Sequence, residues 1–341
     1  MAESNDPIKY ELMKKFLLTG GKFALVGGIL YYLISSDRLN LERLLLLKDS
    51  PNLLMLILSV LVILIVPLAA LRWWLLLRAL GLQVSLRRTF LLTWIGNFFN
   101  STLPGAVTGD IVKGYYIIKT QAEEGRTHAF MTLLIDRFVG LFGLIVISFF
   151  SLIANLSIFL ENPRLHAMIW MICLSFFATT CFYTLVIWPF HDGKDPFLRF
   201  FERLPAKKLT TKIYLAFKSY QNQKPILLST LLIAVLIHCL VAFLFWKISH
   251  LLTATEISLG TQLFLMPIGL ITTAIPLAPG GIGIGHVAFE SLYQLVGVPG
   301  GADIFNMYII IQLAVYLLGG IPYFLYNREY HIPQENISKS L

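Results

Sequence analysis

Six apolar runs, each long enough to cross a bilayer as a helix, constrain this chain more than any other feature. A spanning helix needs about 20 largely apolar residues. The runs lie at 16–35, 51–78, 128–154, 166–190, 225–247 and 304–326. Hydrophobic residues make up 57% of the sequence and charged residues 13%, whereas soluble domains have about 45–50% and about 25%. A helix satisfies its own backbone hydrogen bonds in hydrocarbon, so the sequence predicts an all-α, polytopic membrane protein.

Two further apolar regions, 88–118 and 258–297, are interrupted by proline and glycine. Their centres are NFFNSTLPGAVTGDIVK at 97–113 and AIPLAPGGIGIG at 274–285. Proline removes a backbone donor and glycine weakens a helix. A broken segment at membrane depth is tolerated only inside protein or beside a wet cavity. We interpret each region as a re-entrant hairpin or a pair of short helices, which is a typical pointer to a transport site.

An internal repeat relates two halves, about 16–154 and 166–326, of the single membrane domain predicted for residues 1–341. A shift of 175 residues places Pro104-Gly105 on Pro279-Gly280, helix 51–78 on 226–253 and helix 128–154 on 303–329. Because the paired helices run in opposite directions, the pattern predicts an inverted repeat with a site at the midplane. Coincidence among Leu- and Gly-rich segments is the alternative.

Lysine and arginine are unevenly distributed between the predicted loops. If both broken regions return to the side they leave, cytoplasmic segments hold 19 of the 27 basic residues and outer segments hold 5, with Lys22, Arg72 and Arg137 at membrane depth. The positive-inside rule then predicts a multi-pass protein of the cell (inner) membrane with both termini cytoplasmic. The net charge of +8 follows from this topology and does not indicate a nucleic-acid partner. The first run lacks a small-residue cleavage site, so we expect a retained helix.

The longest loop, 191–224, carries eight basic residues. Apolar residues recur in it at helical spacing, namely Phe197, Phe200, Phe201 and Leu204, then Leu209, Ile213, Phe217 and Tyr220. The pattern predicts a basic amphipathic helix lying on anionic lipid. An ordinary positive-inside loop is the alternative.

Charged residues inside the apolar runs are the first candidates for a site. A charge at the bilayer centre costs at least about 2.5–3.5 kcal/mol on insertion scales, so it normally faces the bundle interior or a cavity. Asp110 and Lys113 share a helix face at i and i+3. We expect Asp136 to pair with Arg72 or Lys113 and to leave Arg137 free. A snorkelling Arg72 and a static ion pair are the structural alternatives.

The first break is also a candidate anion site. If a short helix restarts near Thr108 or Gly109, its N-terminal amides face the cavity and can bind phosphate or carboxylate. Thr108 is the expected N-cap. A capped hairpin without a ligand is the alternative.

The second break combines close backbone approach with two polar side chains. Its glycines and prolines permit unwound carbonyl groups, and His286 and Glu290 follow at i and i+4. No third metal ligand is nearby, and the three cysteines lack metal spacing, so neither a metal nor a cofactor is predicted. We interpret His238 as a packing residue.

Three motifs resemble those of the lysylphosphatidylglycerol synthase transmembrane family, over nearly the whole chain. They are Pro104-Gly105 followed by Gly109-Asp110 and Lys113, Asp136-Arg137 followed by Gly140-Leu141, and Pro276 followed by Pro279-Gly280-Gly281-Ile282-Gly283. The family commonly has Glu-Arg in the second motif and a Glu where this chain has His286, for which Glu290 is the candidate substitute. The resemblance implies lipid translocation. It does not carry over aminoacylation, because the chain has no room for the soluble transferase domain of bifunctional relatives.

The favoured function is that of a flippase or scramblase for a phospholipid or lipid-linked substrate with a charged headgroup. The candidate substrate-binding residues are Arg72, Asn97, Asn100, Pro104, Gly105, Gly109, Asp110, Lys113, Asp136, Arg137, Pro276, Pro279, Gly280, Gly281, Gly283, His286 and Glu290. Membrane lipids with an anionic headgroup or a lipid-linked phosphate are the expected partners, together with a second copy of the chain in a homodimer.

The sequence also bears on the mechanism. It contains no P-loop, nucleophile elbow, HExxH or dinucleotide motif, so we expect neither an enzyme nor an ATP-driven pump. The two remaining mechanisms are scrambling down a lipid gradient and ion coupling, for which Asp110 and Asp136 are the candidate proton carriers. An integral-membrane enzyme using Asp136 or His286 as general base, and a non-transporting assembly protein, are the alternatives.

Overall fold

The computed structural model describes residues 31, 34–35, 41–102, 107–119, 121, 123–156, 160–161, 163–188, 195–203, 207–253, 255–273 and 281–329. In these residues every regular element is a helix. Five helices are long and apolar enough to cross a membrane, at Pro51–Ala79, Gly125–Ala154, His166–Leu185, Lys224–Leu252 and Gly301–Leu325. They coincide with five of the six predicted spans, which confirms an all-α polytopic membrane protein. The remaining span, 16–35, lies outside the described residues except at 31 and 34–35.

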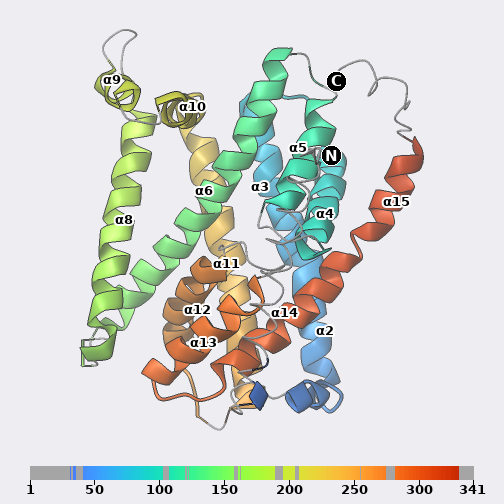
Figure 1. Ribbon diagram of the computed structural model, residues 1–341, viewed down its shortest axis with the longest axis vertical. Coiled ribbons are helices and arrows are strands. Elements are labelled where there is room, and N and C mark those ends of the chain that lie inside the picture. The colour runs from blue at the N-terminus through green and yellow to red at the C-terminus, as the bar shows by residue number, and fades with distance from the viewer. Residues whose placement is uncertain are drawn as a thin grey trace, which may run out of the picture.

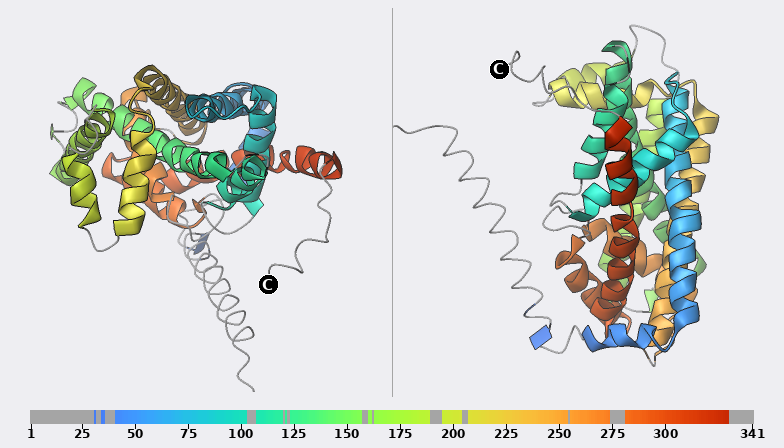
Figure 2. Two further views of the ribbon diagram at one scale, coloured as in Figure 1. Left: turned by 90° about the horizontal axis from the view of Figure 1, so that it is seen from above. Right: turned by 90° about the vertical axis from the view of Figure 1, so that its right-hand side faces the viewer.

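The first described span is one continuous rod (Figure 2, right) built from three helical segments. They are α2 (Pro51–Ser59), the π-helical η2 (Val60–Ile65) and α3 (Val66–Ala79). Pro67 lacks an N–H and crowds the carbonyl group one turn earlier, which interrupts the regular hydrogen-bond ladder. The wider π-helical turns lie directly before this proline and keep the rod continuous.

The two broken regions form hairpins of short helices that enter from opposite ends of the molecule (Figure 1). The hairpins are α4 (Leu86–Thr102) with α5 (Thr108–Ile118), and α12 (Leu259–Thr273) with α13 (Ile284–Leu295). With 11 and 12 residues, α5 and α13 are about 17 and 18 Å long, well short of a hydrocarbon core of about 30 Å. Each chain segment therefore returns to the end from which it came, as the re-entrant alternative requires.

The remaining elements are α6 (Glu123–Ala154), the 3-10 turn η3 (Pro163–Leu165), α8 (His166–Ile187), α11 (Lys224–Leu252), α14 (Gly301–Leu317) and α15 (Gly320–Glu329). Of these, α6, α8 and α11 run between the two ends, α14 and α15 do so together, and the short turn η3 precedes α8. At the top of Figure 1 lie α9 (Pro196–Glu202) and α10 (Lys207–Lys218), and at the bottom lies the 3-10 helix η1 (Leu41–Leu47). We call these the α10 end and the η1 end.

The element order of the second half follows the first at the 175-residue shift. Shifted in this way, α4–α5 falls on 261–293, which α12–α13 occupies, and α6 falls on 298–329, which α14 and α15 occupy. The rod α2–α3 runs from the η1 end to the α10 end, whereas α11 runs the opposite way (Figure 1). The order and direction of the elements are those that an inverted repeat requires.

The last span is interrupted between α14 and α15, where the sequence predicts one helix over 304–326. Residues 318–319 form a turn, and Gly319 lies so close to the Trp94 carbonyl group that a Cβ atom there would overlap it. Trp94 Nε1 in turn donates a hydrogen bond to the Val315 carbonyl oxygen at 3.3 Å. The tight crossing with α4 thus coincides with the break.

The described residues of the 191–224 region form the helices α9 and α10, as predicted, and part of their apolar face is covered by protein. Phe217 and Tyr220 are 3% and 0% exposed. Phe217 packs edge-on against Phe138 of α6, and the Tyr220 hydroxyl donates to the Leu76 carbonyl oxygen at 3.0 Å. Part of the predicted apolar face therefore packs on the end of the bundle, whereas Phe200 remains 56% exposed, and its placement on lipid stays a prediction.

Asp195 joins α9 to α10. Its carboxylate accepts hydrogen bonds from the N–H groups of Phe197 and Leu198 at 3.1 and 3.2 Å, and from the Tyr214 hydroxyl at 2.8 Å. It also pairs with Lys218. Burial raises the pKa of the Asp195 carboxyl, but these hydrogen bonds outweigh burial and hold the pKa below its usual value.

Acidification is expected to undo this junction. Because the pKa of Asp195 is lower in the folded state, its contribution to stability is present above the unfolded pKa of about 4 and is lost as the pH falls through the folded pKa. Asp195→Asn should lower the thermal unfolding midpoint at pH 7, and the difference from the wild type should shrink below about pH 4. Asp49→Asn, at an exposed position of the η1 end, is the control. A deficit that stays constant with pH would contradict this assignment.

Candidate functional site

A contact between two glycines closes the α4–α5 hairpin. A Cβ atom on Gly109 would overlap the carbonyl oxygen of Gly96, and one on Gly96 would lie 3.1 Å from the Gly109 oxygen. Glycine at both positions therefore lets the two backbones touch. Asn100 of α4 completes the contact, because its Oδ1 accepts a hydrogen bond from the Gly109 N–H at 2.8 Å.

This geometry corrects the predicted cap of α5. Thr108 is the first residue of the helix, and the N-cap position belongs to Val107, which makes no side-chain cap bond. One of the N–H groups that a helix start leaves unpaired is instead satisfied by Asn100, from the other arm of the hairpin. Asn100 lies nine residues before Gly109 and reaches it only in the folded hairpin, so neighbouring sequence alone does not predict this cap.

Five charged side chains of α3, α5 and α6 form one continuous ion network. Arg72 Nε lies 2.8 Å from Asp136 Oδ1. Lys113 Nζ lies 2.8 Å from Asp110 Oδ1 and 4.0 Å from Asp136 Oδ2. Arg137 Nε bonds to Asp110 Oδ2. The predicted pairing of Asp136 with Arg72 is confirmed, but the expectation that Arg137 stays free is wrong, because Asp110 reaches it.

The network is buried at its centre and opens at one edge. Its four inner side chains are 10–12% exposed, whereas Arg137 is 39% exposed. Each carboxylate contacts two cations, as burial of charge demands. Three bases and two acids leave one net positive charge, which can attract an anion at the exposed edge.

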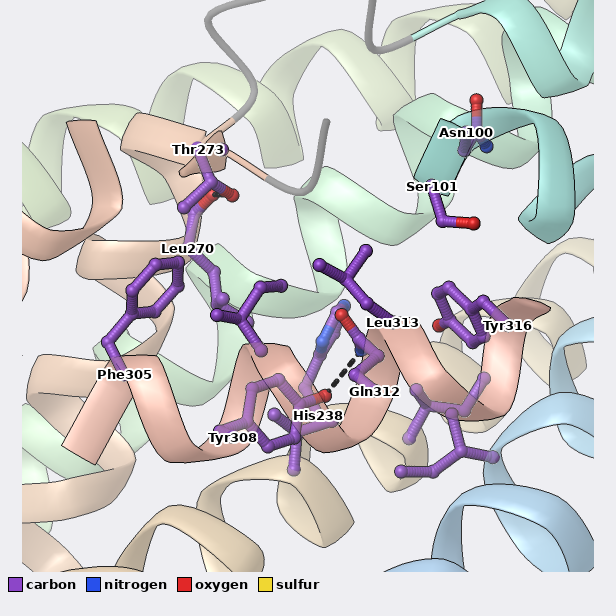
Figure 3. Close-up of a pocket in the computed structure, with 15 residues that line it drawn as sticks. Asn100, Ser101, His238, Leu270, Thr273, Phe305, Tyr308, Gln312, Leu313 and Tyr316 are labelled. Atoms are coloured by element: carbon purple, nitrogen blue, oxygen red, sulfur yellow. Dashed lines mark hydrogen bonds between the residues drawn. The ribbon is translucent and has the colours of Figure 1, made fainter. Parts of the chain in front are cut away.

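A cavity of about 310 Å³ lies between the inner ends of the two hairpins and the helices α11 and α14 (Figure 3). Its lining residues are Ile65, Asn100, Ser101, Ile237, His238, Val241, Leu270, Thr273, Gly281, Phe305, Tyr308, Ile309, Gln312, Leu313 and Tyr316. Both halves of the chain contribute to this wall. Pockets of this size and mixed polarity hold small ligands or headgroups.

None of these lining residues carries a charge at neutral pH when His238 is neutral. Of the predicted site residues within the described part, only Asn100 and Gly281 belong to the lining. The charged candidates Arg72, Asp110, Lys113, Asp136 and Arg137 therefore lie outside the lining of this cavity. Their charges are drawn into the network because each one finds an oppositely charged partner there.

Two contacts connect the cavity wall to the ion network. His238 Nε2 donates a hydrogen bond to the Gly140 carbonyl oxygen at 3.0 Å. A Cβ atom on Gly140 would lie 3.3 Å from a terminal nitrogen of Arg72. On the other side, Asn100 binds the N–H of Gly109, the residue before Asp110. The network thus lies directly behind the polar wall.

The polar residues of α14 were missed by the sequence analysis. Tyr308, Gln312 and Tyr316 follow one another at i, i+4 and i+8, and all three line the cavity. This spacing places them on one face of a helix. A polar stripe of this kind inside an apolar span would have been enough to predict them as cavity residues. His238 was interpreted as packing, yet it stands in the cavity wall (Figure 3).

The polar side chains after the second break have structural partners. His286 is 1% exposed, accepts the Gly283 N–H at 3.2 Å and contacts Asn306 Oδ1 at 3.2 Å. Glu290 is 4% exposed, accepts the Ala302 N–H at 3.0 Å and so caps the start of α14. Neither lines the cavity.

The other predicted site residues are placed as follows. Asn97 is half-buried on α4 and outside the cavity lining. Gly281 and Gly283 have φ of +72° and +88°, a region that favours glycine. Pro104, Gly105, Pro276, Pro279 and Gly280 lie outside the described residues. Within the described residues, no group of three His, Cys, Asp or Glu side chains is placed to hold a metal ion.

Comparison with known proteins places this architecture in a family. No solved structure matches the chain significantly. The chain is 26% identical over 317 residues to "UPF0104 membrane protein PH1989" of Pyrococcus horikoshii. The aligned region covers 84% of this chain and 88% of the relative. The model of the lysylphosphatidylglycerol synthase TM region matches residues 21–322. The chain therefore belongs to the lysylphosphatidylglycerol synthase transmembrane-region family.

Proposed function

We propose that this protein moves a phospholipid or lipid-linked substrate between the two leaflets of a membrane. The observation that carries the proposal is the cavity of mixed polarity between two hairpins that enter from opposite ends. Broken helices that meet at mid-depth are the usual setting of a transport site. In this mechanism the headgroup passes through the cavity while the acyl chains stay in the bilayer.

The ion network supports an anionic lipid phosphate as part of the substrate. Its net positive charge lies behind the cavity wall and is most exposed at Arg137. Low surrounding dielectric strengthens the attraction of such a charge for a phosphate. Neither the fold nor the proposal requires a cofactor, and we infer a transporter in preference to an enzyme.

Flux through the cavity is tested with purified protein in liposomes that contain a fluorescent phospholipid. We expect faster exchange between leaflets than in protein-free liposomes. Ser101→Trp should reduce this rate at least about tenfold, because an indole ring fills space at a cavity-lining position; a tenfold loss corresponds to about 1.4 kcal/mol of barrier. Thr102→Trp, at the exposed neighbouring position, is the matched control. Equal rates with and without protein would refute the proposal, and so would full activity of Ser101→Trp.

We also propose that the α10 end and both termini are cytoplasmic, in the cell membrane, because this orientation places most basic residues inside. The test uses a variant in which Cys173, Cys181 and Cys239 are replaced by alanine. In intact cells, Ser219→Cys at the α10 end should resist a membrane-impermeant maleimide, and Asp49→Cys at the η1 end should react. The reverse labelling would invert the topology.

A further inference from the structure

The polar groups in the cavity wall stand among apolar side chains and are uncharged, although an ion network lies directly behind them. We propose that the cavity binds the neutral, hydroxyl-bearing part of a lipid headgroup, such as a glycerol, inositol or sugar unit. This inference rests on the proposed function and names the class of substrate that the same site takes. It follows from the hydrogen-bonding state of each polar lining residue.

Two lining hydroxyl groups already use their protons. Ser101 Oγ donates to the Phe98 carbonyl oxygen at 2.8 Å, and Thr273 Oγ1 donates to the Leu270 carbonyl oxygen at 2.7 Å. A hydroxyl group has one proton and two acceptor lone pairs. Each oxygen therefore keeps acceptor lone pairs only, one on each hairpin beside the cavity (Figure 3).

The helices α11 and α14 add further acceptors and also donors. His238 donates through Nε2 to Gly140, so its Nδ1 is an acceptor in the neutral ring. This Nδ1 is buried and has no hydrogen-bond partner in the described part of the protein. Gln312 Nε2 donates to the Tyr308 hydroxyl at 2.7 Å. That bond leaves the Gln312 carbonyl oxygen as an acceptor, and the second amide proton and the Tyr308 hydroxyl proton as donors.

A hydroxyl-rich ligand matches this wall better than a charged group. Each hydroxyl both donates and accepts, whereas a phosphate only accepts and an ammonium only donates. A phosphate or ammonium in the cavity would also need an opposite charge within the wall, because an unpaired buried charge is costly. Asp110 and Asp136 already hold two cations each. The segments 103–106 and 274–280, which connect the helices of the hairpins, contain no ionisable residue in the sequence.

The apolar part of the lining suits the same ligand class. Ile65, Leu270 and Phe305 lie among the polar groups, and a polyol presents C–H surface between its hydroxyl groups. Burial of this surface adds about 25 cal/mol per Å² of apolar area to binding. The cavity volume of about 310 Å³ is at the lower limit of typical ligand pockets, about 300–1,000 Å³, which favours a single small unit.

Binding is tested on the detergent-solubilised full chain with water-soluble dihexanoyl lipids that differ only in the headgroup. Thermal shifts as a function of concentration give the affinities. We expect dihexanoyl phosphatidylglycerol and phosphatidylinositol to bind at least about tenfold more tightly than phosphatidic acid and phosphatidylethanolamine, because their hydroxyl groups add hydrogen bonds to the cavity wall. Equal affinities, or tighter binding of phosphatidic acid or phosphatidylethanolamine, would overturn the inference.

Substitutions in the lining show whether a headgroup preference arises in the cavity. Gln312→Leu and His238→Phe remove hydrogen-bonding groups, and each should bring the affinity ratio of phosphatidylglycerol to phosphatidic acid close to one. Thr102→Val, outside the lining, should keep the wild-type ratio. An unchanged ratio in both cavity variants would place the preference elsewhere and overturn the inference.

Flux measurements in liposomes with the same headgroups separate this inference from the proposed function. A polyol preference in binding without any flux would refute transport and leave the binding site standing. Flux of all lipids at one rate, with equal binding, would leave transport standing and refute the polyol site.

Discussion

Asp136→Asn is expected to lower the stability of the folded protein by about 3 kcal/mol, the lower part of the range for breaking a buried ion pair. The Asp136 side chain is 10% exposed and contacts both Arg72 and Lys113. Without its charge, three buried or half-buried cations share the single carboxylate of Asp110. Chemical or thermal unfolding in detergent measures the loss. Glu256→Gln, at an exposed position, should leave stability within about 0.5 kcal/mol of the wild type.

Removal of both partners should restore much of this loss. Arg72→Met combined with Asp136→Leu leaves two bases and one acid, the same net charge as the native network, and replaces the ion pair by apolar side chains. Such replacements of buried pairs are often neutral or stabilising. If the double variant were as unstable as the sum of its single variants, the network would not be acting through charge compensation.

Gly109→Ala is expected to disrupt the α4–α5 hairpin, with a loss of about 3 kcal/mol or more, because overpacking by a methyl group against backbone cannot be relieved by a rotamer change. The added Cβ would overlap the Gly96 carbonyl group. Separation of the helices would also break the Asn100 hydrogen bond and displace Asp110 from the network. Unfolding midpoints and liposome flux should both fall.

Gly96→Ala is the graded control within the same contact. Its Cβ would lie 3.1 Å from the Gly109 oxygen and 3.3 Å from the flexible Lys113 side chain, so a small adjustment accommodates it. We expect a loss below about 1 kcal/mol. Equal effects of the two substitutions would mean that the glycine contact does not determine the hairpin.

The sequence predicts the membrane architecture well because hydrocarbon imposes strict rules. Spans follow from uninterrupted apolar length, and hairpins follow from proline and glycine at mid-depth. Charges such as Asp110 and Asp136 could be predicted to lie near cations, since an unpaired buried charge is too costly. Which cation each would choose could not be predicted, because it depends on helix rotation and on the Gly96–Gly109 contact.

The cavity was much harder to predict. It is assembled from η2, α4, α11, α12 and α14, which are far apart in the sequence. Its polar groups are sparse within apolar runs. Gln312 lies inside the last span, and His238 looks like a packing residue when only its own helix is considered. Conversely, His286 and Glu290 stood out as polar neighbours of a break, but the fold uses both to hold backbone groups.

The opposed hairpins have a consequence for the direction of the proposed transport. Each reaches the cavity from its own end of the molecule, with helices too short to cross the hydrocarbon core. If the protein moves lipids as proposed, a headgroup from either leaflet would pass one half-depth hairpin on its way to the cavity. The path would then have no fixed direction, and net movement would depend on a lipid gradient or a coupled ion.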